Sequence, residues 1–314
     1  MVDIVGLIKP TERKMFSKSK KTFQRSNTPL MFIFSVLISS TALSSDLPMG
    51  SPESVGVSSD RLDRLSESMQ RYIDSNQLAG TVSVISRKGR VIHFESQGFK
   101  SKENREEMSD DTIFFIMSMT KPIVSTALMM LYEEGHFLLT DPITDWIPEL
   151  KNKQVVLENE FGISREPTRQ PINFRHVLSH TAGLDPSREV LTDSEIALLS
   201  RTDNLEDTII KRAPLPLAFH PGEEWQYGSS TDYVALLVER ISGEPLKDYL
   251  RKNIFSPLGM EDTFYSVPED KRDRVASVYS PSGAGQTIEL SRGKEYSDRP
   301  FFGENYYGGT AGLF

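Results

Sequence analysis

The chain has 314 residues, of which 38% are hydrophobic and 25% charged, a composition typical of globular proteins. This length allows one large or two ordinary domains, and the composition excludes collagen-like, disordered and disulfide-scaffold proteins. The absence of cysteine excludes thiol nucleophiles and thiolate zinc sites. The net charge of -8 argues against binding to nucleic acid, which needs clustered Lys and Arg.

The N-terminal segment has the pattern of a secretory signal. Lys and Arg are frequent up to Arg25, and no further charged residue occurs before Asp46. The centre of this gap is the apolar run from Leu30 to Ile38, which small residues follow. This order predicts a signal peptide, cleaved after Ser44 or one residue later. Residues 1–45 are therefore expected to be an N-terminal extension and leader, and the mature protein to be periplasmic or secreted, without stable membrane insertion.

Two alternatives remain for this segment. Residues 26–45 are uncharged and just long enough to span a bilayer of about 30 Å, so they could instead form a membrane anchor. Met15 begins a second basic run, which would make residues 1–14 an upstream extension.

The next elements are a helix and a hairpin. Ser58 to Asp60 can cap a helix with apolar residues at helical spacing, which we expect to pack one face on a core. Strands are expected at Thr81 to Ser86 and Arg90 to Gln97, joined by a turn that contains Gly89.

A buried helix is expected around Ile123 to Leu131, because this run is apolar on nearly every side. Pro122 cannot lie deep inside a helix, so the helix should begin near Ser118. Residues 139–175 read as loops over a small helical region. Further helices are expected at Thr231 to Ile241 and Leu246 to Phe255, and a loop-like chain beyond 260.

The segment Ser118-Met119-Thr120-Lys121 is the first chemical candidate. A serine hydroxyl needs a neighbouring base to become a nucleophile, and side chains at i and i+3 share a helix face. The same spacing occurs at Ser17 to Lys20 and at Ser291 to Lys294, but only Ser118 lies between an apolar approach and a buried helix. The alternative is a helix-capping serine beside a surface lysine.

Tyr227, in HPGEEWQYGSSTDY, is the second candidate, because it directly precedes a predicted helix. A phenol can exchange protons between a nucleophile and a leaving group if cationic neighbours lower its pKa. The alternative is an ordinary packed tyrosine.

His176 and His180 are four residues apart, a spacing that two metal ligands can use. Val177 stands where an H-E-x-x-H motif has its glutamate, and no third ligand is evident. We therefore interpret His180 as structural and expect no metal site.

These segments, in their order and spacing, resemble the serine β-lactamase and penicillin-binding-protein-like family, particularly class C β-lactamases and their esterase relatives. The likeness runs from about Pro52 to Phe314 and rests on the S-x-x-K segment with its apolar helix, FRHVLSHTAGL, the Tyr227 segment and YYGGTAGLF. It implies a mixed α and β, β-lactamase/transpeptidase-like fold in which an antiparallel sheet is flanked by helices and joined by a helical domain. In this reading residues 46–314 form the hydrolase domain, and roughly 111–300 form its helical part and catalytic cleft.

The resemblance also implies roles for the candidates. Ser118 would be the nucleophile that forms an acyl-enzyme, Lys121 the base and Tyr227 the proton relay. The Ser118 backbone N–H would supply one donor of the oxyanion hole. This chemistry needs no metal or organic cofactor, and the partner would be a small-molecule ester or amide.

Two departures from the family pattern shape the expected function. Ser229 stands where class C β-lactamases have the asparagine of Y-x-N, so a hydroxyl would meet the substrate, which favours an esterase. The chain ends at Phe314, before the family's K-T-G or H-x-G strand, so we expect a truncated domain that lacks its C-terminal strands.

The sequence therefore predicts an exported serine hydrolase that cleaves carboxylic esters through acyl-Ser118. A β-lactamase or D-amino-acid peptidase is the alternative of the same class. A non-catalytic cell-wall-binding remnant or inactive fragment is the alternative of a different class.

Overall fold

The structure, a computed structural model, describes residues 47–160, 162–283 and 287–314, which fall within one compact unit, Ser44–Phe314. The predicted leader, residues 1–45, lies outside the described part. Within the described part, no helix combines the length and apolar character needed to cross a membrane.

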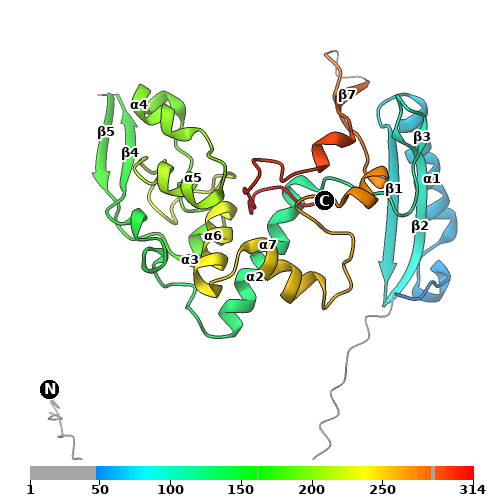
Figure 1. The fold of residues 1–314 in the computed structure, drawn as a ribbon, viewed down its shortest axis with the longest axis horizontal. Coiled ribbons are helices and arrows are strands. Elements are labelled where there is room, and N and C mark those ends of the chain that lie inside the picture. Colours follow the sequence, from blue (N-terminus) through cyan, green and yellow to red (C-terminus); the bar gives the residue numbers. More distant parts are fainter. Residues whose placement is uncertain (1–46, 161, 284–286) are drawn as a thin grey trace, which may run out of the picture. The chain divides into compact units, whose positions relative to one another are not determined.

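A helix and an antiparallel sheet form the N-terminal part of this unit (Figure 1). Helix α1 (Ser59–Asp74) contacts strand β2 (Arg90–Ser101), which pairs with β1 (Gly80–Arg87) on one side and with the short β3 (Glu106–Glu107) on the other. The predicted hairpin is confirmed. Its two-residue turn has positive φ at both Lys88 and Gly89, as a type I′ turn requires.

The largest hydrophobic core lies among the helices. Helix α2 (Thr120–Glu133) packs against α6 (Ser230–Ser242), and both contribute side chains with no exposed surface, among them Leu128 and Leu237. The prediction of a buried helix is thus confirmed, although α2 begins two residues after Ser118. Ser118 itself lies in a 3-10 turn, Met117–Met119, whose first residue, Met117, has a left-handed φ of 45°.

Short elements surround these two helices. They are α3 (Phe174–Leu178), α4 (Asp193–Ile196), α5 (Leu205–Arg212) and α7 (Leu246–Leu250), which continues as a π-helical turn, Arg251–Phe255. The helices expected at Thr231 to Ile241 and Leu246 to Phe255 are therefore confirmed in position.

Two expectations about loops are wrong. Residues 139–175 contain a hairpin of β4 (Gln154–Asn159) and β5 (Gly162–Pro167), and the region beyond 260 contains a hairpin of β6 (Val278–Pro281) and β7 (Ile288–Arg292). Strand β4 is held from outside the hairpin, since Val155 forms a bridge with Leu217. A partner so distant in the chain is invisible in a local pattern.

The segment before β6 connects the sheet with the rest of the unit. The N–H of Ser277 donates to the carbonyl of Lys100 on β2, and Ile113, on the approach to Ser118, forms a bridge with Val275. The sheet is thus tied by backbone hydrogen bonds to the chain that leads into α2.

Candidate active site

Ser118 is exposed just before the start of α2, and hydrogen bonds to a distant segment of the chain fix the backbone around it. The N–H of Ile116 donates to the carbonyl of Leu313 at 3.0 Å, and the N–H of Leu313 donates to the Thr120 hydroxyl at 3.2 Å. Thr120 is completely buried, whereas Ser118 is exposed. The chain near Leu313 therefore fixes the backbone on both sides of Ser118 and leaves the hydroxyl accessible.

Lys121 lies at the centre of three interactions. Its Nζ donates to Ser118 Oγ at 3.1 Å and to the carbonyl of Thr310 at 2.7 Å, and it lies 4.6 Å from the ring centroid of Tyr227. The i, i+3 spacing accounts for the contact with Ser118, because the two residues share one face of the turn. The other two contacts come from residues far away in the sequence.

The hydroxyl of Tyr227 completes the cluster. Hydrogen bonds with Lys121, and to a smaller extent with Ser118, lower the pKa of Tyr227 from its ordinary value. The side chain is 51% exposed, so the phenol faces solvent on its other side. The structure thus brings Ser118, Lys121 and Tyr227 together, and the roles that the family resemblance implies for them stay predictions.

Ser229 lies at the start of α6, two residues after Tyr227. Its N–H donates to Asp185 Oδ2 at 2.8 Å. Gly228 is close to the same carboxylate, since a Cβ at this position would lie 2.1 Å from Oδ2. Asp185 therefore fixes the backbone between Tyr227 and α6, and only glycine fits there.

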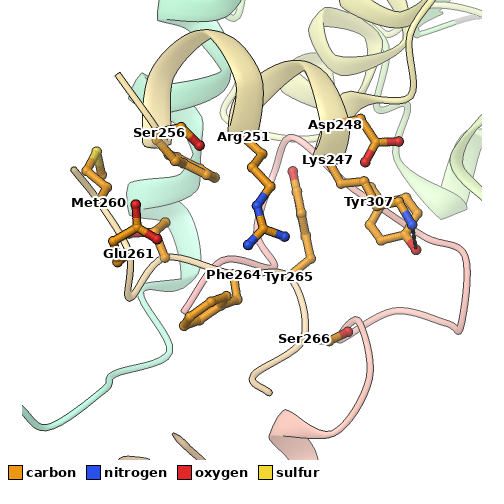
Figure 2. Close-up of a pocket in the computed structure, with 12 residues that line it drawn as sticks. Lys247, Asp248, Arg251, Ser256, Met260, Glu261, Phe264, Tyr265, Ser266 and Tyr307 are labelled. Atoms are coloured by element: carbon orange, nitrogen blue, oxygen red, sulfur yellow. Dashed lines mark hydrogen bonds between the residues drawn. The ribbon is translucent and has the colours of Figure 1, made fainter. Parts of the chain in front are cut away.

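A pocket of about 250 Å³ lies beside α7 (Figure 2). Its lining includes Lys247, Arg251, Phe264, Tyr265 and Tyr307 but none of the four predicted site residues. The hydroxyl of Tyr265 donates to the carbonyl of Gly308 at 2.8 Å, so this pocket adjoins the loop that leads to Thr310.

Comparison with known proteins identifies the family. The family model for Beta-lactamase matches residues 65–314. The chain belongs to the β-lactamase family. Esterase EstB of Burkholderia gladioli is 30% identical over 219 residues, which cover 68% of this chain and 53% of EstB. The lovastatin esterase of Penicillium rubens is 30% identical over 261 residues, which cover 78% of this chain and 63% of that enzyme. The chain thus spans about half the length of the first of these curated relatives.

Solved structures of other proteins share the fold of this chain. EstCE1, described as a hydrolase with promiscuous acyltransferase activity, has a TM-score of 0.64 and 26% identity, covering 80% of this chain and 68% of that one. The prediction of a β-lactamase/transpeptidase-like fold with mixed helices and sheets is therefore confirmed.

His180 lies at this site, which the sequence reasoning did not recognise. Its ring centroid is 5.0 Å from that of Tyr227, and its backbone has a left-handed φ of 59°. Burial lowers the pKa of His180, and the nearby Lys121 charge lowers it further. Its Nδ1 is buried without a hydrogen-bond partner among the described residues. The ring of His180 therefore contacts Tyr227, and the interpretation of His180 as a structural residue stays a prediction.

His176 has a separate, structural task. It forms a capping box with Asn173 at the start of α3, in which its Nδ1 accepts from the Asn173 N–H at 3.3 Å. Among the residues described, no group of three or more His, Cys, Asp or Glu side chains could hold a metal ion.

The cluster has the parts that nucleophilic catalysis by serine requires. An accessible hydroxyl lies within hydrogen-bond distance of an amine, and a phenol with a lowered pKa bonds to both. The Thr310 carbonyl that accepts from Lys121 was missed in the sequence, because a backbone carbonyl has no residue signature.

Proposed function

We propose that this protein is a serine hydrolase that cleaves carboxylic esters through an acyl-Ser118 intermediate. The observation that carries the proposal is the Lys121 amine, which lies 3.1 Å from Ser118 Oγ and hydrogen-bonds to the Tyr227 phenol. A separation of 3.1 Å between Lys121 Nζ and Ser118 Oγ allows a proton to move directly between the two atoms.

Acylation uses all three side chains. The Lys121 amine accepts the hydroxyl proton as Ser118 Oγ attacks the ester carbonyl carbon, whose π electrons move onto the carbonyl oxygen. When this tetrahedral adduct collapses, the C–O bond to the alcohol breaks, and the departing oxygen takes a proton from Tyr227. Lys121 passes its proton to the phenolate, which restores both groups.

Deacylation repeats these steps with water as the nucleophile. Water loses a proton to Lys121 as its oxygen attacks the acyl carbon. When this second adduct collapses, the bond from the acyl carbon to Ser118 Oγ breaks, Oγ takes a proton from Tyr227, and Lys121 returns its proton to the phenolate. The lowered pKa of Tyr227 supports its role, because its phenolate then forms closer to neutral pH than that of a free tyrosine.

Two observations favour an ester over a β-lactam or a peptide. EstB and the lovastatin esterase carry esterase names. Ser229 places a hydroxyl, not an amide, two residues after Tyr227, and we assign it to substrate binding. Faster turnover of a chromogenic cephalosporin or of a D-Ala-D-Ala peptide than of the ester would overturn this preference.

The test uses the full chain, p-nitrophenyl butyrate and a fluorophosphonate probe. We expect turnover of the ester and one covalent adduct by intact-mass spectrometry, and both should be lost in Ser118→Ala. Ser291→Ala is the matched control, because Ser291 and Lys294 have the same spacing in the sequence and Ser291 is exposed on β7. Absence of an adduct in the wild-type chain, or an adduct that persists in Ser118→Ala, would refute the proposal.

Export is a second part of the proposal. It rests on the basic, apolar and small-residue order of residues 1–45. Expression with this leader in a bacterial host should give a mature protein that begins at Ser45 or Asp46, which N-terminal sequencing of the periplasmic fraction and the medium would show. An intact N-terminus in the membrane fraction would instead identify residues 26–45 as an anchor.

A further inference from the structure

A buried carboxylate lies next to the proposed catalytic cluster and has no assigned role. Asp232, in the first turn of α6, is only 2% exposed. Its Oδ1 accepts hydrogen bonds from the N–H of Gly309, from the N–H of Thr310 and from the Thr310 hydroxyl, each at 2.9 Å. Its Oδ2 accepts from the hydroxyl of Tyr306 at 3.1 Å. All four donors belong to one short loop, residues 306–310.

This loop ends at the carbonyl that contacts Lys121. The Thr310 carbonyl accepts from Lys121 Nζ at 2.7 Å, and the N–H of the same residue donates to Asp232. One residue therefore links the buried carboxylate to the proposed base.

The loop has no room to move towards α6. A Cβ on Gly309 would lie 2.0 Å from the carbonyl of Thr231, so the loop backbone lies directly against the first turn of the helix. From another direction the hydroxyl of Tyr265 donates to the carbonyl of Gly308 at 2.8 Å. Tyr265 and Tyr307 line the pocket of Figure 2, which adjoins the loop.

The burial of the Asp232 carboxylate depends on its hydrogen bonds to the loop. A buried carboxylate is costly unless its oxygens are well paired. In the described part of the chain no cation forms an ion pair with Asp232, and the four loop donors supply its hydrogen bonds. Charge-assisted hydrogen bonds of this kind are about twice as strong as neutral ones, so they fix the loop precisely.

We propose that Asp232 is a positioning residue that holds the Thr310 carbonyl against Lys121 and so aims the lysine amine at Ser118. The inference rests on the proposed function. Asp232 does not touch the reacting atoms, and its effect passes through the loop. Without it the carbonyl shifts, and Lys121 loses the acceptor that fixes its direction.

Four substitutions in the full chain test this role. Asp232→Ala removes the acceptor of all four loop donors. Asp232→Asn is the conservative variant, because its carbonyl oxygen can accept from the loop while its NH₂ donates to Tyr306. Gly309→Ala displaces the loop and leaves Asp232 unchanged. Glu239→Ala is the matched control, since Glu239 is a partly buried carboxylate at the other end of α6, where it accepts from the N–H of Leu246 at 2.8 Å.

Ester kinetics give the first readout. We expect kcat of Asp232→Ala and Gly309→Ala to fall by about 10- to 100-fold with little change in KM, the effect of misplacing a catalytic group by about 1 Å. Asp232→Asn should restore most of the loss, and Glu239→Ala should match the wild type.

Titration of Tyr227 gives the second readout, and it needs no catalytic activity. The absorbance of tyrosinate near 295 nm is followed against pH for each variant with and without Tyr227→Phe, and the difference reports Tyr227 alone. The hydrogen bond with Lys121 lowers the pKa of Tyr227, so this pKa should rise in Asp232→Ala and Gly309→Ala and stay in place in Glu239→Ala.

The outcomes separate this inference from the proposed function. An unlabelled, inactive wild type refutes the function, while the Tyr227 titration still decides the role of Asp232. Unchanged kinetics and an unchanged Tyr227 titration in Asp232→Ala refute the inference, as does an equal loss in Glu239→Ala. If Asp232→Ala does not fold, Gly309→Ala takes its place, and wild-type behaviour of that variant refutes the inference equally.

Discussion

Lys153 is a buried amine whose ionisation should make the stability of this protein depend on pH. The residue is 8% exposed and directly precedes β4. Its Nζ donates to the carbonyl of Ala213 at 2.7 Å and to that of Leu215. Burial lowers the pKa of Lys153 from 10.5 to about 8, because the ammonium loses its hydration.

The size of the effect follows from the two pKa values. One pKa unit corresponds to about 1.4 kcal/mol, so the difference between 10.5 and about 8 corresponds to about 3 kcal/mol. Between these two pH values the unfolded chain keeps the proton and the folded chain has lost it. The free energy of unfolding therefore rises with pH across this window, and the full penalty is present below pH 8.

The substitution Lys153→Met removes the ionisable group and keeps an unbranched chain of similar length. Denaturant unfolding at pH 7 and pH 10 gives the stability difference between the variant and the wild type at each pH. We expect this difference to favour the variant by up to about 3 kcal/mol more at pH 7 than at pH 10. The hydrogen bonds to the two carbonyls are lost at both pH values, so they cancel in the comparison.

Lys151→Met is the matched control, because Lys151 is exposed and lies two residues earlier. The free energy of unfolding of Lys151→Met should differ from that of the wild type by the same amount at pH 7 and at pH 10. An equal difference for Lys153→Met at pH 7 and pH 10 would show that Lys153 keeps its proton as easily as a solvated lysine, and would refute the reasoning.

Two further predictions concern stability. Phe174 has no exposed surface and stacks on Phe137 with ring centroids 3.8 Å apart, so Phe174→Ala should lower the free energy of unfolding by about 3–5 kcal/mol in denaturant titrations, and a loss below 1 kcal/mol would contradict this packing. The bidentate ion pair with Arg165 lowers the pKa of Glu195 to about 2, so the stability that this carboxylate provides is complete above its unfolded pKa of 4.5 and is lost as pH falls towards 2. Thermal melts between pH 6 and pH 2.5 should therefore show a smaller acid-induced drop in Tm for Glu195→Gln than for the wild type, and parallel curves would contradict the assignment.

Local sequence patterns predicted the helices and strands that depend mainly on their own residues and not on contacts with distant segments. The run from Ile123 to Leu131 is apolar on all sides and became the buried part of α2. The turn at Lys88 and Gly89 between alternating residues became the β1–β2 hairpin.

The β4–β5 hairpin, which the sequence analysis missed, depends on contacts with distant segments of the chain. Strand β5 is mostly exposed and carries Arg165 and Glu166, so it has no apolar alternation to detect. Its partner β4 is buried through Val155, whose bridge to Leu217 crosses a long stretch of chain. Such pairing is decided by tertiary packing, which overrides local propensity.

The candidate site divides in the same way. Ser118 and Lys121 could be paired from the sequence, because i and i+3 meet on any helical turn. Their meeting with Tyr227 and with the Thr310 carbonyl is tertiary. Asp232 did carry a signal, since a carboxylate in the apolar segment TDYVALLV is unusual unless its oxygens are paired inside the protein.

The first turn of α6 emerges as the common support of the proposed catalytic groups. Just before the helix, Asp185 holds the Ser229 N–H and thereby fixes the backbone that carries Tyr227. Within the first turn, Asp232 holds the loop whose Thr310 carbonyl contacts Lys121. The backbone that carries Tyr227 and the loop whose carbonyl contacts Lys121 are therefore both held near one end of α6, each through a backbone N–H that donates to a carboxylate. Because α6 also packs against α2, which follows Ser118, one helix core supports both the backbone near Tyr227 and the helix that carries Lys121.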